Sequence, residues 1–492
     1  MSDSQDPQHL SVADRRTQGA EAREKTPLDG HSGWSPPTNR SDPIALLEGQ
    51  NATREPDLIP VRHGRMMASA FTFYRGSAAI MASDLAGTPT AGLDVQLCGD
   101  AHLSNFGVFA SPERQLLFDL NDFDETLPGP FEYDVKRLAA SFTIAARNNG
   151  FDPADVRKAS LKVGQAYRTA MAEFARMGTL DIWYAKMSEA DVRASIENVR
   201  RNMEEKEAKR SRQTKLGKSA TVKKEVVQIE RSEQVLRKAR SRTNLQALSK
   251  LTEVVDGRQR IISQPPVLIP LRELEHSAEF DAFDLQDVVR QIFGRYRATL
   301  SDTRRRLLDE HSIVDVARKV VGVGSVGTRA FVVLLEGRDE RDPLFLQVKE
   351  ATRSVLETHL PKSAYDNCGE RVVQGQQLMQ SASDIFLGWS AGVQTDRYYY
   401  WRQLRDMKGS AVIEAMIPKG LSFYAQICGW TLARAHARSG DPIAIAAYLG
   451  DNRTFDRAIA DFAEQYADQN ELDYEAFRDA ISSGRIEARP GV

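Results

Sequence analysis

Cysteine is scarce in this chain of 492 residues, which contains only Cys98, Cys368 and Cys428. Their spacing matches no metal-ligand pattern, and so few cysteines exclude a disulfide framework and indicate a reducing compartment. No apolar run is long enough to span a membrane, and no apolar signal segment opens the chain. The net charge is only −2, so no excess of one sign indicates a polyanionic partner. We therefore expect a cytoplasmic protein with no membrane contact.

Two motifs of common enzyme classes are also absent. The chain has no glycine-rich turn followed by Gly-Lys-Ser/Thr and no His-Glu-x-x-His. These absences argue against a P-loop nucleotidase and a zinc protease.

The most informative segment that is present is LCGDAHLSNFGVFASPERQLLFDLNDFDE, residues 97–125. Asp100 is followed five positions later by Asn105, and a strand-like run over 115–120 leads into Asp119, Asp122 and Asp124. Like charges repel one another, so carboxylates this dense indicate a bound cation. Mg²⁺ bridging a polyphosphate is the natural candidate, since it takes one or two carboxylates together with phosphate oxygens. The Asp-x4-Asn spacing is that of a kinase catalytic loop.

Three segments carry a resemblance to a known family. CGDAHLSN resembles the HGDxHxxN loop of aminoglycoside and choline kinase-like phosphotransferases, with Cys98 in place of the first His. Asp122-Phe123-Asp124 resembles the metal-binding motif that follows that loop, and PGPFEYDVKRLAAS resembles the next segment, with Asp134 at a structural aspartate. The resemblance implies that Asn105 and Asp122 bind metal. Asp119 competes with Asp122, because counting forward from Asn105 favours Asp119 and counting back from Asp134 favours Asp122.

A nucleotide-clamping pattern lies much later in the chain. VVGVGSVGTRAFVVLLEG reads as a strand, a glycine turn (Gly322, Gly324, Gly327) and a second strand, and glycines let backbone amides approach phosphate. LFLQVKEA is a strand with Lys349 near its end, matching the strand lysine that pairs with nucleotide phosphates. A following helical segment carries Glu370, which we expect to be the ion-pair partner of Lys349.

The two halves of this pattern are in swapped order, which predicts a circularly permuted arrangement. The expected fold is α+β, a protein-kinase-like two-lobe architecture with permuted element order and a helical insertion. The whole chain, roughly residues 55–480, also resembles the bacterial family catalogued as domain of unknown function 2252. The expected organisation is a disordered tail (1–54), a catalytic-loop segment (55–184), a basic helical arm (185–250), a helical connector (251–314), a nucleotide-clamping segment with hinge and helix (315–441) and C-terminal helices (442–492).

Two surface features remain without an assigned role. The segment 62–87 reads as a helix that leads into the catalytic strand, and its Arg65 and Arg75 could meet phosphate. The arm is rich in Lys and Arg, but it lacks the interleaved aromatics of a single-strand binder. We therefore expect no nucleic-acid partner, with residues 200–242 as the one segment that could bind one.

The predicted activity is ATP- and Mg²⁺-dependent phosphoryl transfer to a hydroxyl of an unidentified small molecule or protein. Asp100 would orient and deprotonate the acceptor, and Lys349, supported by Glu370, would hold nucleotide phosphates beneath the loop of Gly322, Gly324 and Gly327. Three alternatives stay open: nucleotidyl (AMP) transfer by the same site, a nucleotide-binding pseudokinase with a regulatory role, and metal-dependent phosphoester hydrolysis. The sequence does not indicate the oligomeric state.

Overall fold

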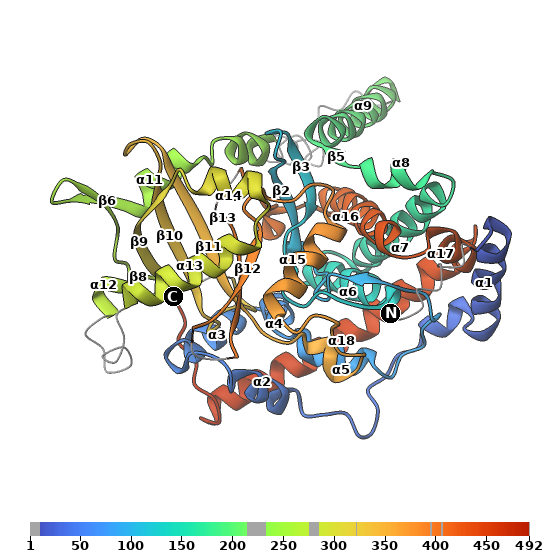
Figure 1. Cartoon of the computed structure of the whole chain (residues 1–492). Coiled ribbons are helices and arrows are strands. Elements are labelled where there is room, and N and C mark those ends of the chain that lie inside the picture. The colour runs from blue at the N-terminus through green and yellow to red at the C-terminus, as the bar shows by residue number, and fades with distance from the viewer. Residues whose placement is uncertain are drawn as a thin grey trace, which may run out of the picture.

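The structure is a computed structural model that describes residues 10–213, 233–274, 285–320, 322–393, 396–404 and 407–491. An antiparallel sheet with a few covering helices forms one side, and a larger helical body forms the other (Figure 1). The expected α+β class is confirmed. The strands are β1 Asp94–Leu97, β2 Phe106–Ala110, β3 Leu116–Leu120, β4 Leu127–Pro130, β5 Met187–Ser188, β6 Thr252–Val255, β7 Arg258–Ile261, β8 Leu268–Pro270, β9 Ser312–Lys319, β10 Ala330–Glu336, β11 Pro343–Ala351, β12 Gly388–Ala391 and β13 Tyr398–Gln403.

The helices have these bounds: α1 Val12–Lys25, α2 Pro43–Asn51, α3 Ile59–Met66, α4 Ala70–Gly76, α5 Ala78–Leu85, α6 Phe131–Asn148, α7 Pro153–Phe174, α8 Thr179–Tyr184, α9 Glu189–Gln213, α11 Asn244–Leu251, α12 Leu271–Leu274, α13 Leu285–Thr299, α14 Asp302–Leu308, α15 Cys368–Met379, α16 Pro418–Ser439, α17 Pro442–Leu449 and α18 Thr454–Ser482.

The large sheet has the strand order β12-β13-β11-β10-β9-β8, and all of its neighbouring strands are antiparallel. Apolar side chains cover both of its faces. On one face, Tyr296 of α13 stacks on Trp401 of β13 with ring centroids 4.5 Å apart. On the other face, Leu251 and Phe345 belong to a separate buried cluster. Strand β11 is buried along its whole length, as expected for a central strand with both faces covered.

The helical body joins segments that are far apart in the sequence. Helices α6 and α7 pack against α16, α17 and α18, which come from the C-terminal quarter of the chain. Helix α6 is buried on almost every side. Between this body and the sheet lie the β2–β3 hairpin, the β1–β4 pair and helix α15 (Figure 1). The strand expected over 115–120 is confirmed as β3.

Part of the expected organisation is wrong. Residues 10–54 are not a disordered tail, since α1 and α2 are folded against the C-terminal helices; residues 1–9 lie outside the described part. A Cβ on Gly19 of α1 would lie 2.1 Å from the carbonyl oxygen of Ala444, so the two helices touch there. Arg40 bridges Asp84 and Asp473 at 2.7 Å each. These contacts are polar or made by glycine, so the polar composition of the segment gave no sign of them.

Two further boundaries change. The expected helical connector 251–314 also contains β6, β7 and β8, and β8 extends the large sheet; residues 275–284 lie outside the described part. The segment 62–87, expected as one helix, is divided among α3, α4 and α5. In the arm, residues 214–232 are outside the described part. None of the helices in the described part of the chain combines the length and apolar character that a membrane span requires.

Candidate functional site

A polar cleft of about 860 Å³ lies between the sheet and the helical body. The two halves of the sequence pattern meet there. The loop around Asp124 contacts the strand that carries Lys349, although the two residues are 225 positions apart in the chain. The cleft is lined by Gln50, Arg54, Arg75, Gly76, Ala78, Asp100, His102, Asn105, Asp122, Asp124, Glu125, Gly322, Val323, Gly324, Ser325, Thr328, Glu350, Ala351 and Thr352. The catalytic-loop residues and the glycine loop therefore face a common space.

The loop over 98–105 is held from behind by the start of α6. The Asp134 carboxylate accepts hydrogen bonds from the backbone N–H groups of Cys98 (2.8 Å) and Gly99 (3.1 Å), and Nε2 of His436 lies 3.2 Å from it. Gly99 has φ +82°, and a Cβ there would lie 2.2 Å from the carbonyl oxygen of Glu125, so only glycine fits. Asp134 thus has the structural role expected for it.

Asp100 lies in the cleft with 20% of its side chain exposed. Its Oδ1 accepts a hydrogen bond from Nε of Arg137 of α6 at 2.8 Å, and Nη2 of Arg137 lies 2.7 Å from the same oxygen in an ion pair. The Asn105 side chain donates to the Asp100 carbonyl oxygen at 2.6 Å, which fixes the two residues relative to each other. Nδ1 of His102 accepts from the backbone N–H of Ser104, so this histidine shapes the loop. Burial lowers the pKa of His102 to about 3, which leaves the ring neutral at physiological pH.

Lys349 is buried behind the wall of the cleft, next to two carboxylates that line it. It is 3% exposed, and its Nζ donates to Oδ2 of Asp124 at 2.7 Å and lies 3.9 Å from Oδ1 of Asp122. Asp124 also accepts from the Tyr400 hydroxyl (2.6 Å) and from Oγ of Ser325 in the glycine loop (3.1 Å). Burial disfavours the charged form of Asp124, but Lys349 and these hydrogen bonds outweigh it and lower the pKa of Asp124 to about 2.

Asp122 is the more open of the two carboxylates, with 33% of its side chain exposed. Burial and then the negative charge of Asp124 raise the pKa of Asp122. Lys349, 3.9 Å away, and Arg402 oppose this shift without cancelling it, whereas Asp124 is hydrogen-bonded directly to Lys349.

Asp119, the expected competitor for the metal, lies elsewhere. It is fully buried, forms an ion pair with Arg434 of α16, and accepts from the backbone N–H and Oγ of Ser381 at 2.8 Å each. It does not line the cleft. The sequence spacing could not separate Asp119 from Asp122, because the β-hairpin geometry decides which of them reaches the cleft.

The glycine loop is the β9–β10 connection, as expected from the sequence. Gly322 and Gly327 have φ of +66° and +88°, a backbone conformation that favours glycine. The N-terminal segment holds this loop from outside. Arg54 donates to the carbonyl of Val326, Arg65 donates to the carbonyl of Gly322 at 2.6 Å, and the N–H of Glu55 donates to the carbonyl of Gly327 at 2.7 Å.

Glu370 does not pair with Lys349 in this structure, so the predicted ion pair is absent between these two described residues. Its neighbour Arg371 performs a different task. The buried Arg371 guanidinium donates to the carbonyl oxygens of Asp124, Thr126 and Thr352. Helix α15 therefore fixes the acidic loop through Arg371, while the charge of Lys349 is balanced by Asp124.

The model of a bacterial family, described as an uncharacterized protein conserved in bacteria (DUF2252), matches residues 54–234 and 225–480. The chain belongs to this family. Every residue that lines the cleft lies within the matched DUF2252 region, with the exception of Gln50. No curated protein and no solved structure matches the chain.

Sequence reasoning missed the contacts of three residues that organise the cleft of this DUF2252 member. Tyr400 lies in a run of three tyrosines, and only the register of β13 beside β11, which pairs it with Lys349, selects it. Arg137 lies in the quoted PGPFEYDVKRLAAS segment, but its partner Asp100 is 37 positions away. Asp124 is the second aspartate of the Asp-Phe-Asp motif, and its pairing with Lys349 depends on the tertiary fold.

The cleft contains oxygen ligands suited to Mg²⁺ but no complete protein cage. Among the described residues, no group of three or more His, Cys, Asp or Glu side chains could hold a metal ion. Asp122 and Asp124 offer two carboxylates, and Asn105 offers an amide oxygen in the same cleft. Mg²⁺ in phosphate-transferring sites takes one or two carboxylates and completes its shell with substrate phosphate and water, so this donor set fits the expected ion.

Proposed function

We propose that this protein is an ATP- and Mg²⁺-dependent phosphotransferase that acts on a hydroxyl group. The observation that carries the proposal is the ion pair between buried Lys349 and Asp124 at 2.7 Å, beside Asp122 and beneath the glycine loop. It joins the strand lysine to the acidic motif, the two parts that phosphoryl transfer requires and that the sequence separates by more than 200 positions.

Each residue then has a physical role. Lys349 would bind nucleotide phosphates as a charge, and the backbone N–H groups of the glycine loop would bind their oxygens. Asn105, Asp122 and Asp124 would hold the metal, which neutralises phosphate charge when bound. Arg137 holds Oδ1 of Asp100, so its Oδ2 is the atom that would accept a hydrogen bond from the acceptor hydroxyl.

The proposed fold is a kinase-like two-lobe arrangement with permuted element order. Its support is the sequence of elements: the glycine hairpin β9–β10, the lysine strand β11, helix α15, the β12–β13 pair and helix α16 follow one another in the order expected of a nucleotide-clamping lobe. The loop 98–105, the β2–β3 hairpin and Asp122 would continue that order, but they precede it in the chain.

The first test is thermal denaturation of the full chain with ATP, with Mg²⁺ and with both. We expect a rise in Tm that needs both together, because the phosphates and the carboxylates share the metal. A rise with Mg²⁺ alone would support phosphoester hydrolysis instead. No rise under any condition, at ligand concentrations in the millimolar range, would remove the nucleotide from the proposal.

Two alternatives share the nucleotide site and need a separate assay. Incubation with ATP labelled at the α- or the γ-phosphate, followed by a search for labelled products, separates AMP transfer from phosphoryl transfer. The Asp100–Arg137 ion pair is the observation that favours a pseudokinase, since Arg137 already occupies Oδ1 of the proposed catalytic carboxylate. Nucleotide binding without any transferred label, across a panel of hydroxyl-bearing small molecules and proteins, would favour that alternative.

A further inference from the structure

Three arginines from the N-terminal segment lie near the glycine loop, and they differ in what they contact. Arg54 and Arg65 each donate to a backbone carbonyl of the loop, so they hold its shape. Arg75, at the end of α4, lines the cleft, and no hydrogen bond or ion pair joins its guanidinium to another described residue. Its Nε is buried without a partner, and its guanidinium lies 5.9 Å from the centroid of the Phe71 ring.

The Asp100 carboxylate does not satisfy Arg75. Asp100 lies close enough to stabilise the charge of Arg75, but its Oδ1 is bonded to Arg137. Burial lowers the pKa of Arg75, and the charges of Asp100 and Glu414 oppose that shift only in part. A partly desolvated cation without a hydrogen-bonded anion is unfavourable, so its position indicates an anionic ligand.

The surroundings of Arg75 indicate which anion. A Cβ on Gly324 would lie 3.2 Å from the Arg75 carbonyl oxygen, so the glycine loop packs directly against this residue. Asp100, Asn105 and Asp122 line the same cleft. Arg75 is therefore located between the loop expected to bind phosphates and the aspartate expected to orient the acceptor.

We propose that Arg75 binds the terminal phosphoryl group of the nucleotide, an inference that rests on the proposed phosphotransferase function. The guanidinium fork matches phosphate oxygens and keeps its charge at all physiological pH values. An arginine that reaches the transferred phosphoryl group also stabilises the charge of the transition state. Here the arginine comes from the same chain, and it is supplied by α4 rather than by the glycine loop or the lysine strand.

The test compares nucleotides that differ only in the terminal phosphate. Affinities for ADP and for a non-hydrolysable ATP analogue, both with Mg²⁺, are measured for the wild type, Arg75→Met and Arg75→Lys. We expect Arg75→Met to bind the ATP analogue at least about tenfold more weakly, the loss typical of a hydrogen bond to a charged group. ADP affinity should be unchanged, and Arg75→Lys should recover part of the loss.

The matched control is Arg338→Met, because Arg338 is 83% exposed in the β10–β11 turn, at the opposite end of the hairpin from Lys349. It should alter neither affinity. Tm values measured without ligand show whether each variant is folded. Equal losses for ADP and the ATP analogue, or no loss for either, would overturn the role of Arg75.

Inorganic tripolyphosphate separates failure of this inference from failure of the proposed function. In one outcome the wild type binds tripolyphosphate but no nucleotide, and Arg75→Met lowers the affinity for tripolyphosphate. This outcome would overturn the phosphotransferase proposal and retain Arg75 as a phosphate-binding residue. A wild type that binds neither probe would overturn both.

Discussion

Asp122 and Asp124 are separated by one residue, yet their pKa values shift in opposite directions. The ammonium of Lys349 and the hydroxyl of Tyr400 stabilise the charge of Asp124, whereas burial and then the repulsion of Asp124 raise the pKa of Asp122. The chain thus keeps one carboxylate firmly charged and the other more open. This asymmetry suits a site in which Asp124 positions Lys349 while Asp122 meets an incoming cation.

Removing Lys349 tests this pair directly. Lys349→Met leaves Asp124 with no cationic hydrogen-bond partner, so we expect the free energy of unfolding to fall by about 2 kcal/mol, less than for a fully buried pair because Asp124 is 28% exposed. Adding Asp124→Asn to this variant should restore part of the loss, since the uncompensated charge is then gone. Urea unfolding of both single variants and the double variant measures the coupling; purely additive effects would contradict the pair.

The raised pKa of the buried Glu125 carboxyl makes the stability of the protein depend on pH. Burial chiefly raises its pKa from 4.5 to about 7, so the folded state retains a proton that the unfolded state releases between these pH values. The unfolded state binds fewer protons there, and the contribution of Glu125 to stability falls as pH rises from about 4.5 to about 7. The slope is at most about 1.4 kcal/mol per pH unit, the value for one proton.

The matched variant is Glu125→Gln, which keeps an oxygen to accept the hydrogen bond from the Val355 N–H. Denaturant unfolding at several pH values measures the free energy of unfolding of both proteins. The value for the wild type should fall relative to that for the variant as pH rises from about 4.5 to about 7. Parallel pH profiles for the two proteins would mean that Glu125 has an ordinary pKa.

At the scale of secondary-structure elements, α15 acts on the acidic loop through Arg371. Arg371→Ala removes hydrogen bonds to three carbonyl groups, so we expect a loss of about 3 kcal/mol in the free energy of unfolding and a weaker effect of ATP with Mg²⁺ on Tm. The adjacent Glu370→Ala is the control. It should leave the free energy of unfolding and the effect of ATP with Mg²⁺ on Tm nearly unchanged. If Glu370→Ala instead lost only the effect of ATP with Mg²⁺ on Tm, the predicted Lys349–Glu370 pair would hold for the nucleotide-bound protein.

Sequence patterns were informative about elements and less so about the contacts between them. The glycine turn, the strand over 115–120 and the strand that carries Lys349 follow from local composition and alternation, and the structure contains all three. The choice of Asp124 over Glu370 as the partner of Lys349 depends on the packing of β11 beside the acidic loop. No local pattern encodes that packing, and the same reason explains why Asp119 and Asp122 could not be told apart.

At the scale of the whole molecule, the N-terminal segment is part of the site rather than an appendage. It supplies Gln50 and Arg54 to the cleft, and it packs through α1 against α17 from the opposite end of the chain. Composition predicted disorder because few apolar side chains are involved: only Gly19 and Ala22 of α1 are buried. Contacts made by glycine and by paired charges leave almost no periodic signal in a sequence.

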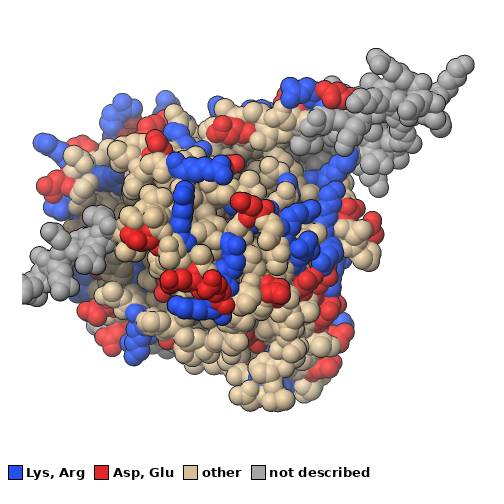
Figure 2. Space-filling view, turned by 90° about the vertical axis from the view of Figure 1, so that its right-hand side faces the viewer, with Lys and Arg blue, Asp and Glu red and all other residues tan. Residues whose placement is uncertain are grey.

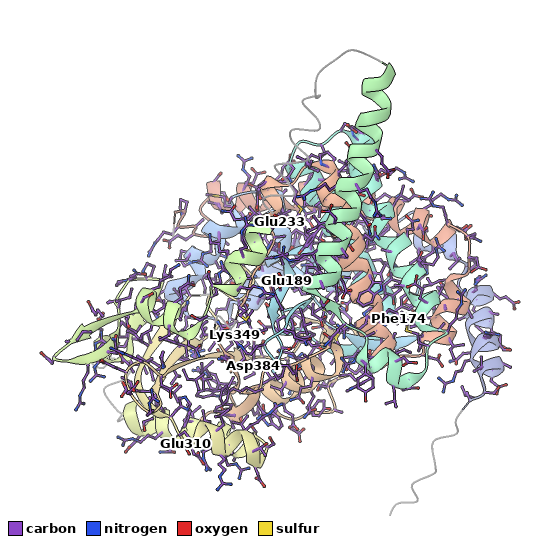
Figure 3. All side chains as sticks on the ribbon, turned by 90° about the horizontal axis from the view of Figure 1, so that it is seen from above. Phe174, Glu189, Glu233, Glu310, Lys349 and Asp384 are labelled. Carbon is purple, nitrogen blue, oxygen red and sulfur yellow. The ribbon has the colours of Figure 1, made fainter. Side chains whose placement is uncertain are left out.

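Helix α9 of the basic arm projects away from the body (Figures 1 and 3). Its base is tied to the body, since Glu189 pairs with Arg240 at 2.6 Å, and Leu236 and Ala239 are buried. Both Glu189 and Glu233 are labelled near that base in Figure 3. On the face shown in Figure 2, Lys and Arg side chains lie among Asp and Glu side chains, which fits the nearly balanced net charge. A deletion of residues 200–242 would thus cut into packed structure.

A shorter replacement tests whether the arm is an accessory. Nη2 of Arg200 lies 3.4 Å from Oε1 of Glu233, so the two sides of the arm are close at that point. A linker of four Gly and Ser residues, which spans up to about 14 Å, can replace residues 202–231. We expect the effect of ATP with Mg²⁺ on Tm to stay within about 1 °C of the wild type, because none of the described residues that line the cleft belongs to the replaced segment. If the variant folds with an unchanged ligand-free Tm but no longer responds to ATP and Mg²⁺, the arm belongs to the nucleotide site. If nucleotide binding persists while binding to nucleic acid at low salt is lost, the arm is a separate binding element.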